Sequence, residues 1–124
     1  MQKKILIADD DASLVEVLTS RLRQHNYDVI CAFDAMQAIM MAVSNKPDLI
    51  ILDIKMPAGT GRGALENLKN FNKTSAIPVI VITAYPSEDL RSFAIEKGAA
   101  DFLEKPFQPE ALLESIGKIF QEEK

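Results

Sequence analysis

The residues Ile5-Leu-Ile-Ala-Asp-Asp-Asp11 join a short apolar run directly to three consecutive aspartates. An apolar run of this length, rich in Ile and bounded by charged residues, is typical of a strand buried on both faces of a sheet. Runs of the same kind follow at Val29–Ala32, Leu49–Leu52 and Val79–Ile82, with a weaker one at Ala99–Leu103. The sequence therefore predicts five buried strands, the first of which ends in a cluster of acids.

Segments with helical spacing separate and follow these runs. Their apolar residues recur at intervals of three and four positions: Leu14, Leu18 and Leu22; Met36, Ile39, Met40 and Val43; Leu65 and Leu68; Leu90, Phe93 and Ala94; Leu112, Ile116, Ile119 and Phe120. We expect Asp34 to cap a helix, Pro86 and Pro109 to lie in first helical turns, and Gly98 to end a helix. The segment Pro86–Lys97 has the thinnest apolar face, and we expect it to be the least stable helix.

Strict alternation of strands and helices predicts an α/β domain in which helices cover both faces of a parallel sheet. Right-handed crossovers favour a single doubly wound, flavodoxin-like sheet of five strands in the order 2-1-3-4-5. The chain has 124 residues, and no repeat, linker or composition shift divides it, so we expect one domain over residues 1–124.

The composition excludes several classes of protein. A net charge of −4 argues against nucleic-acid binding, and the single cysteine, Cys31, excludes internal disulfides and multi-cysteine zinc sites. The longest apolar run, Ala38–Val43, is too short to span a membrane, and the first residues do not form a secretion signal. We therefore expect a cytoplasmic protein.

Polar side chains stand at the carboxyl ends of four predicted strands, where open parallel sheets bind their ligands. They are Asp9 and Asp10 after the first strand, Asp53 at the end of the third, Thr83 at the end of the fourth and Lys105 after the fifth. Neighbouring strands lie roughly 5 Å apart, so the acids of the first and third strands share one rim. Each pair of like charges about 4 Å apart costs on the order of 4 kcal/mol at an effective dielectric constant near 20.

A bound cation relieves that repulsion. Lys105 supplies one positive charge against three carboxylates, and the oxygen-only ligand set favours a hard divalent ion, Mg²⁺, with Mn²⁺ as an alternative. Because Mg²⁺ combines one or two carboxylates with water and a phosphate oxygen, a phosphorylated group is the expected guest.

Four segments together carry a family resemblance. They are Ile5–Asp10, Leu52-Asp53-Ile-Lys-Met56-Pro57 with Gly61 after it, Ile82-Thr83-Ala84, and Glu104-Lys105-Pro106-Phe107. Over nearly the whole chain the sequence resembles the receiver domain of two-component response regulators, the CheY-like family. The resemblance implies that Asp53 accepts a phosphoryl group from the phosphohistidine of a histidine kinase, with Mg²⁺. It also implies a cis peptide bond between Lys105 and Pro106.

The remaining site roles also follow from the resemblance. Asp10 is implied as the direct metal ligand, Asp9 as its helper, and Asp53 and the Lys55 carbonyl as further ligands. Thr83 and Lys105 are implied to contact the phosphoryl oxygens.

The resemblance further implies a switch and positions that tune it. After phosphorylation Thr83 moves toward the phosphoryl group, Phe102 turns inward, and the surface of the fourth helix, fifth strand and fifth helix changes. Phe102 replaces a frequent tyrosine or histidine and so lacks a polar group to report the switch. We also expect Lys55 and Tyr85 to tune the lifetime of the phosphoryl group, with Lys55 over that group and Tyr85 screening it from water.

The implied partners are a sensor histidine kinase or a histidine phosphotransfer protein, and a downstream protein or fused output domain. No direct nucleic-acid or membrane binding is expected. The implied state is a monomer or a phosphorylation-dependent dimer, and the implied chemistry is limited to self-phosphorylation and autodephosphorylation, without a separate enzymatic activity. The alternative is a receiver-like scaffold that binds proteins without phosphorylation.

Enzymes and carriers of the same broad fold fit the residues less well. A flavodoxin-type flavin carrier needs a Ser/Thr-rich loop after the first strand, where this chain has three aspartates. Aspartate-based phosphohydrolases usually carry a second aspartate two residues after the nucleophile, at the position of Lys55.

Several other residues favour structural interpretations. We expect Asp11 to be a solvated residue or an acid of the first helical turn and not a third metal ligand, and Cys31 to be a small, buried and chemically quiet side chain. Met36, Met40 and Met41 are expected to fill the core, with one of the three exposed.

Overall fold

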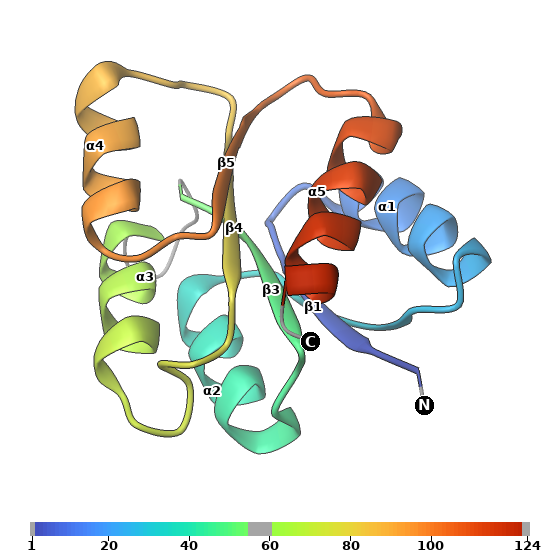
Figure 1. The fold of residues 1–124 in the computed structure, drawn as a ribbon, viewed down its shortest axis with the longest axis horizontal. Coiled ribbons are helices and arrows are strands. Elements are labelled where there is room, and N and C mark those ends of the chain that lie inside the picture. Colours follow the sequence, from blue (N-terminus) through green and yellow to red (C-terminus); the bar gives the residue numbers. More distant parts are fainter. Residues whose placement is uncertain (1, 55–60, 123–124) are drawn as a thin grey trace.

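A parallel sheet of five strands forms the centre of the computed structural model, which describes residues 2–54 and 61–122 (Figure 1). The elements follow in the order β1 (Lys4–Ala8), α1 (Ala12–Gln24), β2 (Asp28–Ala32), α2 (Ala35–Asn45), β3 (Leu49–Asp53), α3 (Gly61–Asn70), β4 (Val79–Thr83), α4 (Glu88–Glu96), β5 (Asp101–Glu104) and α5 (Pro109–Glu122). The strands lie in the order β2-β1-β3-β4-β5. The predicted fold class and strand order are confirmed.

The sheet separates two hydrophobic cores. Alternate residues of each strand point to opposite faces, so that Leu6 faces α2, α3 and α4 while Ile5 and Ile7 face α1 and α5. Figure 1 shows these two groups of helices on opposite sides of the strands. Because both faces are covered, every residue of β3 and β4 is buried, as their continuous apolar sequences predict.

Capping residues fix where the helices begin and end. Asp34 accepts a hydrogen bond from the backbone N–H of Gln37, Pro109 is the first residue of α5, and Gly98 follows α4 with a positive φ of 93°. The expectation for Pro86 is wrong, because α4 begins at Glu88. Ser87 is its N-cap and accepts a hydrogen bond from Leu90, so Pro86 lies before the helix.

The inward face of α2 also differs from the prediction. Ala35, Ala38 and Ala42 are buried against the sheet, whereas Met36 and Met40 are both exposed and only Met41 of the three methionines is partly buried. Small residues let this helix pack close to the strands, and the larger side chains then have no room inside. Cys31 is likewise partly exposed instead of buried, because β2 is an edge strand.

No helix within residues 2–54 and 61–122 has the combination of length and apolar character that crossing a bilayer requires.

Candidate phosphoacceptor and metal site

Three carboxylates meet at the carboxyl edge of the sheet. Asp9 and Asp10 follow β1, and Asp53 is the last residue of β3, the strand paired with β1. One carboxylate oxygen from each of the three lies within 4.8 Å of the other two. Asp9 and Asp53 are buried and Asp10 is exposed, so the cluster has a dry side and a side open to solvent.

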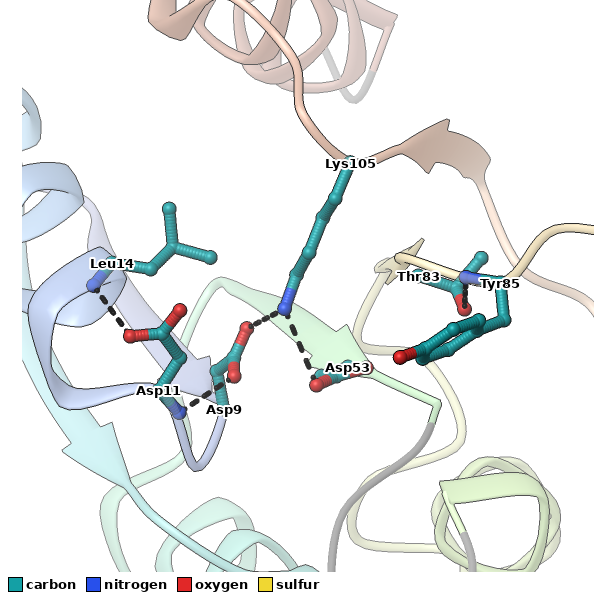
Figure 2. Close-up of polar contacts among 7 residues, drawn as sticks. All are labelled: Asp9, Asp11, Leu14, Asp53, Thr83, Tyr85 and Lys105. Atoms are coloured by element: carbon teal, nitrogen blue, oxygen red, sulfur yellow. Dashed lines mark hydrogen bonds and ion pairs between the residues drawn. The ribbon is translucent and has the colours of Figure 1, made fainter.

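Lys105 reaches this cluster from the residue after β5. Its Nζ lies 2.7 Å from Asp9 Oδ2 and 3.4 Å from Asp53 Oδ2, between the two buried acids (Figure 2). The backbone N–H of Lys105 donates a hydrogen bond to the Thr83 carbonyl at 2.8 Å, which fixes the end of β5 against β4. The Lys105–Pro106 peptide bond is cis, as predicted.

Burial and the neighbouring charged groups together set the pKa values of Asp9 and Lys105. Burial raises the pKa of the Asp9 carboxyl above its usual range, and the negative charge of Asp53 adds to that effect against the opposing influence of Lys105 and the Asp11 N–H. For Lys105, burial disfavours the ammonium, but the carboxylates of Asp9 and Asp53 outweigh burial and raise its pKa. The lysine is therefore held firmly in its charged form.

Asp11 serves the local structure of this rim. Its side chain accepts a hydrogen bond from the Leu14 N–H at 3.1 Å and so caps α1, while its own backbone N–H donates to Asp9 Oδ1 at 2.9 Å. Asp11 is exposed and lies just before the helix. The tight turn therefore fixes Asp9 in place, and Asp11 is a capping residue, one position before the expected first turn.

Thr83 and Tyr85 form the other wall of the site. Thr83 is fully buried at the end of β4, and its Oγ1 accepts a hydrogen bond from the Tyr85 N–H at 3.1 Å (Figure 2). The Tyr85 side chain is 71% exposed. An open cavity of about 510 Å³ adjoins this wall, lined by Asp11, Leu14, Ala84, Tyr85, Lys105, Pro106 and Phe107.

Phe102 lies in β5 with its side chain inside the protein. It is 7% exposed and packs in the core between the sheet and α2, α3 and α4. The guanidinium of Arg91 from α4 covers its ring at 4.8 Å from the ring centre. The Phe102 side chain is therefore directed inward in this structure, and the switch itself stays a prediction.

The donor set fits a hard divalent cation. Three carboxylates and one ammonium leave a formal charge of −2, and the cluster offers oxygen ligands only. Asp9 Oδ2 is buried and, apart from its ion pair with Lys105, accepts no hydrogen bond from the described residues. This buried oxygen therefore retains acceptor capacity for a cation.

The sequence predicted correctly which residues lie together at this edge of the sheet. Asp9, Asp10, Asp53 and Lys105 converge as expected, and Thr83 closes the same edge. Lys55, expected as a carbonyl ligand and a tuning residue, lies outside the described residues.

Sequence reasoning missed two features of the site's surroundings. The first is the apolar lining by Leu14 and Phe107, although Phe107 could have been inferred from its place next to Lys105-Pro106. The second is Arg91 over Phe102, for which the sequence carries no signal.

Comparisons with known proteins agree with this geometry. A model of the response regulator receiver domain matches residues 5–117. A CheY-like receiver domain protein from Methanospirillum hungatei is 29% identical with a TM-score of 0.93, the match covering 98% of this chain and 96% of that one. The signal receiver domain of a putative LuxO repressor protein from Vibrio parahaemolyticus is 34% identical with a TM-score of 0.87, covering 94% and 88%. The chemotaxis response regulator CheY4 of Vibrio cholerae is 28% identical with a TM-score of 0.89, covering 96% and 99%.

Proposed function

The chain belongs to the response regulator receiver domain family, and on that premise we propose that Asp53 accepts a phosphoryl group from a phosphohistidine. Family membership supports a phosphoacceptor role in two-component signalling. The observation that carries the assignment to Asp53 is its buried carboxylate at the carboxyl edge of β3, beside Asp9 and Asp10 and 3.4 Å from the ammonium of Lys105.

The transfer is a displacement at phosphorus. A carboxylate oxygen of Asp53 forms the new P–O bond while the P–N bond to the donor imidazole breaks, and the imidazole takes up a proton as it leaves. The main obstacle is the approach of one anion to another, so fixed positive charge lowers the barrier. Lys105 is held charged beside Asp53, where its ammonium can pair with a phosphoryl oxygen, and the buried Thr83 hydroxyl can contact another.

Asp9, Asp10 and Asp53 are the residues that would hold Mg²⁺, or Mn²⁺ in its place. When bound, the ion supplies positive charge against both the carboxylates and the phosphoryl oxygens. The fit rests on the oxygen-only donor set and on the acceptor capacity left on Asp9 Oδ2.

The proposed partners follow from the family. A sensor histidine kinase or a histidine phosphotransfer protein would supply the phosphoryl group, and an output protein or domain would read the surface of α4, β5 and α5. The proposed chemistry of the chain itself is limited to phosphorylation and dephosphorylation of Asp53, and the proposed location is the cytoplasm.

The experiment that tests the acceptor is intact-mass analysis after incubation with Mg²⁺ and acetyl phosphate. We expect a mass increase of one phosphoryl group on the wild type and none on Asp53→Asn. Asp34→Asn is the matched control, since Asp34 only caps α2 and asparagine caps equally well. A wild type that stays unmodified would favour the protein-binding scaffold, and an adduct that persists in Asp53→Asn would place the acceptor elsewhere.

The switch we propose is a shift between two packings of Phe102. Because Phe102 is buried under Arg91 here, phosphorylation would raise the population of this arrangement at the expense of one with the ring exposed. In that change the Thr83 hydroxyl would leave the Tyr85 N–H for the phosphoryl group. NMR spectra of the Phe102 ring, recorded with and without phosphodonor, measure the shift, and identical spectra would contradict it.

Tyr85 is proposed to set the phosphoryl lifetime. Its side chain is exposed and is directed toward Asp53 (Figure 2), where it can limit the access of water. Tyr85→Ala is expected to change the rate of dephosphorylation, and Lys55→Ala tests the companion position; unchanged decay in both variants would contradict the proposal.

A further inference from the structure

The ring of Phe102 is buried although its strand lies at the edge of the sheet. β5 is the last strand in the order and pairs with β4, and Phe102 packs in one core with Leu90 and Ala94 of α4. Arg91, which follows Leu90 in the helix, is exposed and places its guanidinium 4.8 Å from the centre of the Phe102 ring. Apolar side chains and one cation therefore cover the ring together.

The contact between Arg91 and Phe102 is electrostatic. The face of an aromatic ring carries partial negative charge, which attracts a cation within about 6 Å of the ring centre. Within residues 2–54 and 61–122, Arg91 pairs with no carboxylate. Arg62 of α3 differs, because its guanidinium lies 5.0 Å from the Phe93 ring and also pairs with Asp89. In this part of the chain, the charge of Arg91 is therefore directed to the Phe102 ring and is not shared with an acid.

The neighbouring hydrogen bonds fix the backbone of Phe102 and not its ring. Asp101 Oδ1 accepts from the Phe102 N–H at 2.7 Å, and Asp101 Oδ2 accepts from the Ser115 hydroxyl of α5. These bonds hold the start of β5 in place, so a change in the packing of Phe102 is expected to be a rotation of its side chain. A phenylalanine ring has no polar atom with which to hold either position. The contact with Arg91 is therefore an interaction that favours the inward position and is lost when the ring turns outward.

We propose that Arg91 is a positioning residue, whose guanidinium holds Phe102 inward before any phosphoryl group arrives and so sets the fraction of chains already in the switched packing. This inference rests on the proposed switch of Phe102 and adds the residue that biases it. A group that stabilises the packing favoured by phosphorylation also favours ligands that mimic the phosphoryl group, because coupling between two linked equilibria is reciprocal. Removing the charge of Arg91 therefore exposes the ring and weakens the binding of such ligands at Asp53.

NMR of the full chain with ring-¹³C-labelled phenylalanine tests the position of the ring directly. The Phe102 cross-peak is assigned by its loss in Phe102→Leu. Without phosphodonor, Arg91→Gln should lower the ratio of inward to outward rings by about three- to fivefold, the effect of an exposed cation–π contact. Arg91→Lys, which keeps a cation, should retain most of the wild-type ratio. A Phe102 cross-peak that stays at its wild-type position in Arg91→Gln would overturn the proposal.

Arg62→Gln is the matched control for this experiment. It removes a guanidinium from the face of Phe93, on the same helix as Arg91. Arg91 is exposed and Arg62 is partly exposed, so neither substitution opens the core. Arg62→Gln should move the Phe93 cross-peak and leave that of Phe102 unchanged. Equal displacement of the Phe102 cross-peak in both variants would indicate a general loosening of α4 and would also overturn the proposal.

A phosphoryl mimic tests the link between Arg91 and Asp53. Beryllium fluoride, titrated with Mg²⁺ and followed by the Phe102 cross-peak, should bind up to about fivefold more weakly to Arg91→Gln than to the wild type, and equally to Arg62→Gln and the wild type. An unchanged affinity in Arg91→Gln, with its ring displaced, would overturn the proposal. A wild type that binds no mimic would instead contradict the proposed function of Asp53, and the ring populations without ligand would still decide the role of Arg91.

Discussion

Two partly buried lysines lie at opposite ends of the sheet, and their surroundings differ sharply. At the carboxyl end, Lys105 lies between the carboxylates of Asp9 and Asp53. At the amino end, Lys69 of α3 donates hydrogen bonds to the backbone carbonyls of Ile77 at 2.7 Å and Ser75 at 3.3 Å, in the segment that leads into β4. The Lys105 ammonium compensates the charge of two carboxylates, whereas the Lys69 ammonium holds the loop before β4 through hydrogen bonds.

The pKa values of the two lysines move in opposite directions for that reason. Burial lowers the pKa of Lys69, because neutral carbonyls do not compensate for lost hydration. Burial acts on Lys105 as well, but the two carboxylates more than offset it and raise its pKa. At the amino end of the sheet, the buried polar groups around Lys69 are paired by hydrogen bonds. At the carboxyl end, the carboxylates around Lys105 repel each other, and a bound cation would reduce that repulsion.

The largest expected effect is on the rate of Asp53 phosphorylation, which should depend on Lys105 and not on Lys69. Lys105→Met should slow phosphorylation of Asp53 by about 100-fold, because it removes the fixed positive charge beside the acceptor. Lys69→Met should leave that rate unchanged and lower the free energy of unfolding by about 2 kcal/mol through its lost hydrogen bonds. Rates from acetyl phosphate and urea unfolding curves measure both quantities. Equal rates in the two variants would contradict the assignment of Lys105.

The next effect compares an acid from each end of the sheet. Asp10→Asn should weaken Mg²⁺ binding by at least about tenfold, because it removes an exposed carboxylate from the cluster. Asp48 is the control, since its carboxylate accepts a hydrogen bond from the Lys4 N–H at the amino end. Asp48→Asn should bind Mg²⁺ like the wild type in isothermal titration calorimetry. A similar loss in both variants would indicate a long-range charge effect in place of a site.

A third comparison uses two buried threonines, Thr74 and Thr83. The Thr74 hydroxyl donates to the Leu68 carbonyl at 2.6 Å, so Thr74→Val strands a buried acceptor and should cost about 1–2 kcal/mol of unfolding free energy. Thr83 accepts from the N–H of exposed Tyr85, which water can satisfy instead, so Thr83→Val should cost less than about 1 kcal/mol. Thermal unfolding measures both losses of stability. A larger loss for Thr83→Val than for Thr74→Val would show that the Thr83 hydroxyl contributes mainly to the stability of the fold.

The smallest effect is the dependence of stability on alkaline pH. With its raised pKa, Lys105 contributes stability that is present below the ordinary lysine value of 10.5 and is lost as the pH rises through the folded-state value. With its lowered pKa, Lys69 contributes stability that increases as the pH rises from its folded-state value toward 10.5. Urea unfolding from pH 8 to pH 11 should therefore show Lys105→Met and Lys69→Met deviating from the wild type with slopes of opposite sign. Deviations of the same sign would contradict these directions.

The contrast also explains what the sequence could predict. Strand ends are marked by a change from apolar to polar residues, so the meeting of Asp9, Asp53 and Lys105 followed from strand order alone. The contacts of Lys69 depend on how the loop before β4 folds back over α3, and no pattern in the sequence encodes that path.

The error on α2 has a packing cause. Helical periodicity pointed to Met36 and Met40 as the inward face, because they are the largest apolar residues at the right spacing. The short distance between α2 and the sheet selects alanine instead, and that distance depends on the neighbouring elements and not on the helix itself. The same dependence on neighbours left Cys31 partly exposed on an edge strand.

The cluster of Asp9, Asp10 and Asp53 also affects how readily proteases degrade the chain. Those acids come together only when β1 and β3 are paired, so an ion that neutralises them binds the folded chain and leaves the unfolded chain nearly untouched. The concentration of free magnesium would then govern how often the backbone opens to proteases. With the Mg²⁺ site that we propose, ion supply would influence the turnover of the chain as well as the phosphorylation of Asp53.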